Sequence, residues 1–253
     1  MSFGDAISEF LVDAPAATGA GPVVHRCGGR GCMGGCDAVV PQRGDFCQAC
    51  AEHNSRELRT NLLKNARRSL PDWPEARFDH ANFPKRVVLE VARPAVAWRP
   101  TTPDGSTNNL TLLGSTGVGK TTAAVAICHR ILETAETKAI PAEKFRLARG
   151  LRWTAAWDLG AAGRQWKLGD GLPPQIAEAV RAPLLIIDDL GKESRPRDTE
   201  DDAIWTVLDQ RYRQRGFVTI VTSKLRMSEL GERYGLDARR RFTERGVVVE
   251  HFR

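Results

Sequence analysis

The sequence predicts an α/β fold with a five-stranded parallel sheet, preceded by a small cysteine-rich segment. Three observations predict it: a glycine-rich loop between an apolar strand and a helix, a second apolar strand that ends in two aspartates, and further apolar runs at α/β spacing. A chain of 253 residues can hold one sizeable α/β domain and a smaller appendage. We expect the N-terminal domain over 1–75 and the α/β domain over 76–253.

The glycine-rich loop follows a short apolar strand at 110–113 and precedes a helix expected over 122–132. It satisfies the phosphate-binding Walker A pattern G-x-x-x-x-G-K-[ST]. Glycines let backbone N–H groups surround a phosphate, and the helix N-terminus attracts anions. Lys120 is expected to reach the β- and γ-phosphates, and the Thr121 hydroxyl to coordinate Mg²⁺. The expected binding residues are Gly114, Ser115, Thr116, Gly117, Val118, Gly119, Lys120, Thr121 and Thr122.

The second motif is the run Leu-Leu-Ile-Ile-Asp-Asp-Leu-Gly over 184–191. Four aliphatic residues predict a strand that is buried on both faces, and the carboxylates follow at the edge where a nucleotide would sit. We expect Asp188 to bind Mg²⁺ and Asp189 to orient or activate the attacking water. The plainer interpretation is an internal strand with a polar end, which needs two adjacent aspartates by chance.

The remaining elements follow in α/β order. Strands are expected at 152–157, 217–223 and 247–250, with a proline-started helix at 174–181 and later helices that include 228–230 and 237–242. The strand at 217–223 ends in Thr222 and Ser223. Such hydroxyls can sense a γ-phosphate through a water, or simply mark the exit from a strand. The residue expected to contact nucleotide is Ser223, with Thr222 as the alternative.

Five of the six cysteines lie close together before residue 51, in segments rich in glycine. This spacing predicts a tetrahedral structural zinc site, because glycine-rich loops can bring several sulfurs to one ion. The expected ligands are Cys27, Cys32, Cys47 and Cys50, with Cys36 as the alternate. Free or redox-active thiols are the other interpretation.

Charge and hydropathy constrain the partners and the compartment. The net charge of +6 favours an anionic partner such as nucleic acid, although a merely basic surface fits it too. An amphipathic helix is expected within 51–70, with a basic face that contacts DNA or solvent. No signal peptide or membrane span is visible, so we expect a cytoplasmic protein with no membrane partner.

From about Asp79 onward the sequence resembles the DnaC/IstB group of AAA+ ATPases, which contains helicase loaders and transposition helpers. Four features carry the resemblance: the two Walker motifs, Thr-Ile-Val-Thr-Ser at 219–223, and Glu-Leu-Gly-Glu-Arg at 229–233 followed by an Arg-Phe pair. The resemblance implies a sheet of order 5-1-4-3-2 and ATP bound between subunits of an oligomer. It also implies that Arg241 is an arginine finger. Lys224 departs from the asparagine that the group often has there.

The resemblance implies an ATPase that loads a replicative helicase, engages it through residues 1–75 and binds single-stranded DNA through an oligomeric ring or spiral. The expected cofactors are ATP, Mg²⁺ and Zn²⁺. The alternative is an IstB-like ATPase that assists a transposase by remodelling duplex DNA. A GTPase switch is disfavoured because the sequence has no [NT]-K-x-D guanine-reading motif. A zinc adaptor that only binds nucleotide also remains open.

Overall fold

A computed structural model describes residues 25–26, 39–40, 48–137, 142–166, 171–193 and 200–252. Its contacts divide the chain into two units, Met1–Lys64 and Asn65–Arg253, with the boundary inside helix α2 (Gln48–Arg68). In the first unit, strands β1 (His25–Arg26) and β2 (Val39–Val40) pair antiparallel. Helix α2 confirms the helix expected within 51–70. Within the described residues, no helix combines the length and apolar character that a membrane-spanning helix needs.

The second unit is built on a parallel sheet of five strands in the order β4-β5-β6-β3-β7. Counted along the chain from β3, this is the predicted order 5-1-4-3-2, which is therefore confirmed. The strands are β3 (Asn109–Gly114), β4 (Leu151–Ala155), β5 (Leu184–Leu190), β6 (Val218–Ser223) and β7 (Gly246–His251). All of β6 and nearly all of β3 is buried, as expected for central parallel strands that are covered on both faces.

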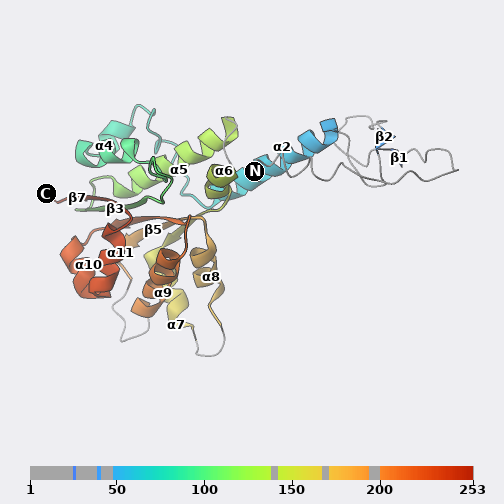
Figure 1. The fold of residues 1–253 in the computed structure, drawn as a ribbon. Coiled ribbons are helices and arrows are strands. Elements are labelled where there is room, and N and C mark those ends of the chain that lie inside the picture. The colour runs from blue at the N-terminus through green and yellow to red at the C-terminus, as the bar shows by residue number, and fades with distance from the viewer. Residues whose placement is uncertain are drawn as a thin grey trace. The chain divides into compact units, whose positions relative to one another are not determined.

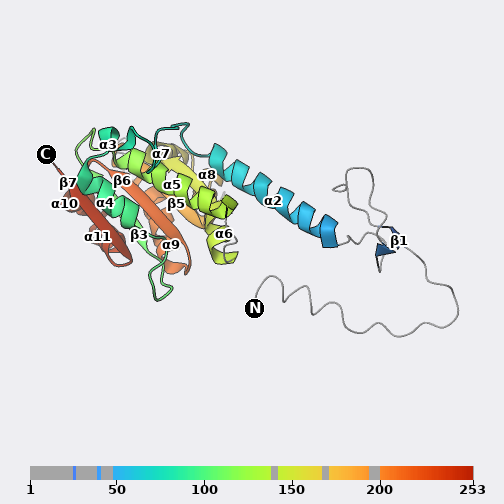
Figure 2. The ribbon, with the colours of Figure 1, turned by 90° about the horizontal axis from the view of Figure 1, so that it is seen from above.

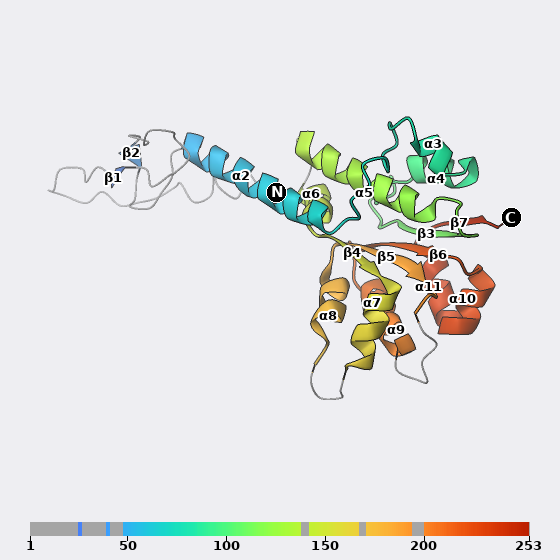
Figure 3. The same cartoon turned by 180° about the vertical axis from the view of Figure 1, so that it is seen from behind.

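Two layers of helices cover the sheet (Figure 1, Figure 3). One layer contains α3 (Phe83–Arg86), α4 (Leu89–Ala97), α5 (Lys120–Thr137) and α6 (Ala142–Arg149), and Figure 2 looks onto it. The opposite layer contains α7 (Ala156–Arg164), α8 (Pro174–Arg181), α9 (Glu200–Arg213), α10 (Met227–Tyr234) and α11 (Leu236–Thr243). The result is an α/β/α arrangement.

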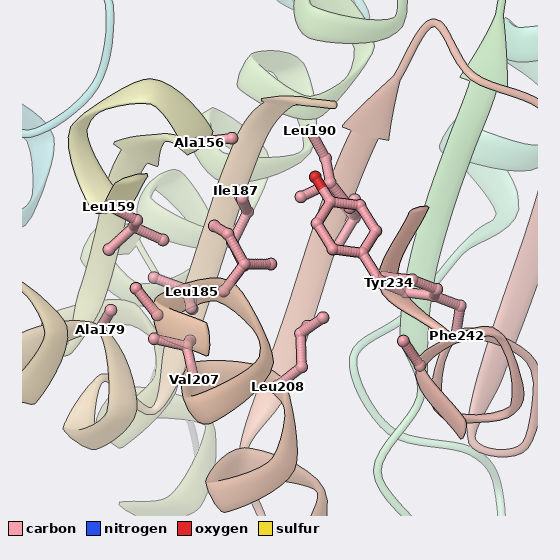
Figure 4. Close-up of a cluster of buried hydrophobic side chains, with 14 of the residues drawn as sticks. Ala156, Leu159, Ala179, Leu185, Ile187, Leu190, Val207, Leu208, Tyr234 and Phe242 are labelled. Atoms are coloured by element: carbon pink, nitrogen blue, oxygen red, sulfur yellow. The ribbon is translucent and has the colours of Figure 1, made fainter. Parts of the chain in front are cut away.

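A hydrophobic core lies between the sheet and the second helix layer (Figure 4). Leu185 and Ile187 of β5 are fully buried there and pack with Leu159 of α7 and Val207 of α9. The strand expected over 152–157 is present as β4, but its predicted end was wrong: the strand ends at Ala155, and α7 begins at the next residue. β4 is an edge strand, and only its first residue is buried. The apolar residues in the sequence therefore did not show where the strand ends.

Candidate nucleotide-binding site

The glycine-rich loop connects β3 to α5, as the sequence predicts. Gly117 and Gly119 have φ angles of 87° and 90°, a left-handed conformation that side chains rarely adopt. A Cβ atom on Gly119 would also lie 2.4 Å from the Arg86 carbonyl oxygen. The segment after α3 thus rests directly on the loop, and the Val88 N–H donates to the Val118 carbonyl at 3.2 Å.

Lys120 is the buried cation of the loop, with 7% of its surface exposed. Its Nζ donates to the carbonyl oxygens of Gly114 at 2.8 Å and Ser115 at 2.9 Å. Burial lowers the pKa of Lys120, partly offset by the charges of Asp188 and Asp189. A desolvated ammonium group that has only two carbonyl partners favours an anion beside it.

The two Walker motifs meet at Asp188. The Thr121 hydroxyl donates to Asp188 Oδ1 at 2.9 Å, and the Thr222 hydroxyl donates to the same oxygen at 2.6 Å. Burial raises the pKa of Asp188 above its usual value, although both hydrogen bonds lower it. A hydroxyl and a carboxylate oxygen at one sheet edge are the hard oxygen donors that Mg²⁺ takes, so the residues present fit the ion.

Asp189 has an unusual backbone. Its φ angle is 56°, and no other described residue besides glycine has a positive φ. The pairing of β5 with β6 shifts register between Ile187 and Leu190, and the Asp189 N–H donates to the Thr222 hydroxyl at 2.9 Å. The side chain is turned outward, where Lys192 Nζ lies 3.0 Å from its Oδ2. Strained residues held by such contacts are typical of functional sites.

The two hydroxyls at the end of β6, which the sequence left as alternatives, have different hydrogen-bond partners in the structure. Thr222 contacts Asp188 and Asp189, whereas Ser223 ties strands together. The Ser223 hydroxyl donates to the Leu190 carbonyl at 2.6 Å and accepts the Leu225 N–H at 3.0 Å. Thr222 and Ser223 are both fully buried and neither lines the adjacent cavity, whereas Lys224 does, so their hydrogen bonds alone distinguish the two hydroxyls. The geometry therefore favours Thr222 as the hydroxyl near the carboxylates.

A cavity of about 530 Å³ opens at this edge of the sheet. Five of its lining residues are cations and one, Asp189, is a carboxylate. Sequence reasoning did not assign Lys85, Arg86 or Lys192 to the site, because they come from segments outside the expected motif positions. The lining residues are Lys85, Arg86, Thr116, Gly117, Gly119, Lys120, Thr121, Thr122, Asp189, Lys192 and Lys224. This excess of positive charge fits a polyphosphate.

Arg241 lies in α11 and does not line this cavity. Its guanidinium forms an ion pair with Asp209 of α9. It also lies 4.4 Å from the centre of the Trp205 ring and 4.9 Å from that of Tyr212. Its predicted role concerns a neighbouring subunit and stays a prediction.

The zinc prediction falls mostly outside the described residues, which exclude Cys27, Cys32, Cys36 and Cys47. Cys50 is described and is buried in α2. In the part of the chain that the structure describes, no group of three or more His, Cys, Asp or Glu side chains could hold a metal ion. The zinc site therefore stays a prediction.

Comparisons with known proteins place the chain in a family. Three solved structures with a similar fold are the DnaC helicase loader, DnaI, and AMPPCP-bound DnaA from Aquifex aeolicus. Their identities are 20%, 18% and 19%, with TM-scores of 0.49, 0.45 and 0.45. The alignments cover 70%, 76% and 70% of this chain, and 97%, 93% and 50% of those chains. No curated protein matches.

The family model described as IstB-like ATP binding protein matches residues 54–239, which is more than half of the chain. The match spans both Walker motifs and the cavity between them. It confirms the resemblance that these motifs predict. The chain belongs to the family of IstB-like ATP-binding proteins.

Proposed function

We propose that the chain is a magnesium-dependent ATPase. One observation carries the proposal: the Walker A residues Lys120 and Thr121 meet the Walker B carboxylates Asp188 and Asp189 beside a cationic cavity. Lys120 binds the β- and γ-phosphates, and the oxygens of Thr121 and Asp188 hold Mg²⁺. The ion supplies charge neutralisation on the phosphates. Asp189 orients the attacking water from a backbone that is already held in place.

The test separates an enzyme from a protein that only binds nucleotide. ATP and GTP compete for the purified chain with Mg²⁺, and ATP hydrolysis is measured in parallel. ATP is expected to win the competition and to be hydrolysed. Asp189→Asn should keep ATP affinity and lower hydrolysis by about a hundredfold or more, the range typical of a general base. No affinity for adenine nucleotide, with or without DNA, would falsify the proposal.

The ATPase serves to load a replicative helicase in this proposal. Residues 1–75 contact the helicase and hold zinc through the predicted cysteines, while residues 76–253 form a self-associating ATPase that binds single-stranded DNA. The net charge of +6 supports an anionic partner. One similar solved structure is titled as a helicase loader. Arg241 reaches the γ-phosphate bound by a neighbouring subunit.

Co-purification with candidate replicative helicases, in ATP and in ADP, tests this use of the ATPase. The mass of each complex and its zinc content are measured together. A complex that forms with ATP and is released after hydrolysis is the expected result. Failure of every candidate helicase from the host to bind would count against loading.

The second candidate function is assistance to a transposase, and the family description as IstB-like favours it. In that case ATP promotes oligomers on duplex DNA rather than a complex with a helicase. Duplex bending measured by fluorescence energy transfer discriminates the two functions. Bending without helicase binding identifies the transposition helper, and helicase binding without bending identifies the loader.

A further inference from the structure

A buried carboxylate lies outside the chemistry proposed above. Glu193 follows β5 by three residues, and its side chain is completely inaccessible to solvent. Among the residues that the structure describes, it is the only acidic residue in the buried class. Burying a carboxylate is costly unless it is paired and hydrogen-bonded, so its contacts indicate what it does.

Glu193 connects two parts of the chain. On one side, its Oε2 accepts the Gly191 N–H at 2.9 Å. On the other side, its Oε1 accepts a hydrogen bond from Arg233 Nε at 3.0 Å and another from the Tyr234 hydroxyl. Arg233 Nη2 also donates to the Glu193 carbonyl at 2.8 Å. Burial raises the pKa of the Tyr234 phenol, so this hydroxyl stays protonated and keeps donating.

The first connection fixes the turn that follows the Walker B strand. Gly191 has a φ angle of 91°, and a Cβ there would lie 2.4 Å from Leu225 Cδ1. The Lys192 N–H donates to the Asp189 carbonyl at 3.1 Å, which closes the turn around Asp189. The bond from Gly191 to Glu193 therefore holds the turn that begins at the proposed water-orienting residue.

The second connection fixes the corner between α10 and α11. Arg233 and Tyr234 form the end of α10, and Gly235 alone separates the two helices. Tyr234 packs in the hydrophobic core between the sheet and the second helix layer, where its hydroxyl points toward Leu190 at the end of β5 (Figure 4). The helix after this corner carries Arg241.

We propose that Glu193 is a positioning residue that couples the Walker B turn to the α10–α11 corner. A change at Asp189 on nucleotide binding shifts the Gly191 N–H, and Glu193 transmits that shift through Arg233 and Tyr234 to α11. The carboxylate suits this role because it accepts from both sides at once. An apolar side chain of similar size would fill the space without linking the two segments. The inference rests on the proposed nucleotide site.

Amide hydrogen exchange on the full chain tests the coupling. Exchange of residues 227–243 is compared with and without a non-hydrolysable ATP analogue and Mg²⁺, for wild type, Glu193→Gln and Tyr234→Phe. Glu193→Gln replaces an acceptor by an amide that cannot accept from both sides. Glu232→Gln is the matched control, because Glu232 lies on α10 beside the partners of Glu193 and is exposed.

The wild type is expected to show slower exchange in α10 and α11 when the analogue binds. Glu193→Gln should bind the analogue within about threefold of wild type, lose this response, and lower kcat about tenfold with little change in KM. Tyr234→Phe keeps the ring packing and should lower kcat about threefold, which guards against a misfolded glutamine variant. Glu232→Gln should behave as wild type.

A normal exchange response in Glu193→Gln overturns the coupling alone, whether or not that variant is thermally destabilised. Equal losses of analogue affinity and kcat also overturn it, because they indicate general damage to the site. A wild type that binds no nucleotide removes the proposed function and the coupling together. A wild type that binds nucleotide without any response in α10 and α11 removes only the coupling.

Discussion

Lys120 and Arg211 are the two buried cations among the described residues of the α/β unit. They lie at opposite ends of the parallel strands and have opposite surroundings. Lys120 donates to two carbonyl oxygens and lines a cavity of about 530 Å³. Arg211 of α9 is 3% exposed, and the space beside it measures only about 30 Å³. Its guanidinium donates to the carbonyls of Ala179, Val180, Ala182 and Val218 and to the Thr219 hydroxyl.

The comparison shows which observations decide the role of a buried charged side chain. Burial lowers the pKa of both side chains, in Arg211 to about 9, so desolvation does not distinguish them. What distinguishes them is the number of internal partners and the space next to the charge. The Arg211 guanidinium donates to carbonyls at the end of α8 and the start of β6, so its hydrogen bonds connect that helix to the sheet. Lys120 keeps donor capacity next to a cavity that is large enough for a nucleotide.

Replacing Arg211 should produce the largest effect, and the effect should be on stability. Arg211→Met removes the donors from several buried carbonyls, so we expect a loss of about 3–5 kcal/mol in the free energy of unfolding. Urea unfolding measures it. Arg213→Met is the control, since Arg213 lies on the same helix with a side chain that is 74% exposed. Unchanged stability with weakened nucleotide binding would reverse the roles assigned to the two cations.

Replacing Lys120 should show the converse pattern. Lys120→Met is expected to weaken ATP binding about a hundredfold, which corresponds to about 2.7 kcal/mol. Stability without nucleotide should not fall, because the variant no longer buries a charge at a position where burial lowers the lysine pKa. Titration calorimetry measures the ATP affinity, and urea unfolding of the same preparation measures the stability without nucleotide. A variant that unfolds readily yet binds ATP normally contradicts the comparison.

Local sequence patterns were enough to predict most elements, and the Walker residues that they single out lie together at one end of the sheet. Walker A and Walker B each lie within one strand-to-loop junction, so their positions follow from short segments. Lys85 and Arg86 could not be placed, because they reach the cavity through the packing of a distant segment against Gly119. The choice between Thr222 and Ser223 depends on the register shift between β5 and β6, which no single strand encodes.

Thr222 and Ser223 at the end of β6 show the same contrast between a role at the site and a role in stability, with smaller expected effects. Thr222→Val removes the partner of both Asp188 and the Asp189 N–H, so we expect kcat for ATP to fall about tenfold, or about 1.4 kcal/mol. Ser223→Ala removes bonds between strands and should cost about 1 kcal/mol of stability with kcat unchanged. Steady-state kinetics and urea unfolding of both variants make the test. If Ser223→Ala alone lowers kcat, the serine is the sensor after all.

The smallest expected effect concerns pH at the carboxylate end of the site. Burial raises the pKa of Asp188 above its ordinary value of 3.8, so the metal-free folded chain holds this proton more tightly than the unfolded chain does. The stability that comes from this group is therefore present at low pH and is lost as the pH rises through the raised pKa. Mg²⁺ needs the carboxylate, so its apparent affinity with ATP should decline by about a few-fold as the pH falls from neutral toward the raised pKa of Asp188. Calorimetric Mg²⁺ titrations at constant ionic strength, with an ATP-only titration to subtract protonation of the nucleotide, measure this decline. Asparagine cannot titrate, so Asp188→Asn cannot couple proton release to metal binding and should not show this decline. A decline of the same size in Asp188→Asn would mean that another group causes it.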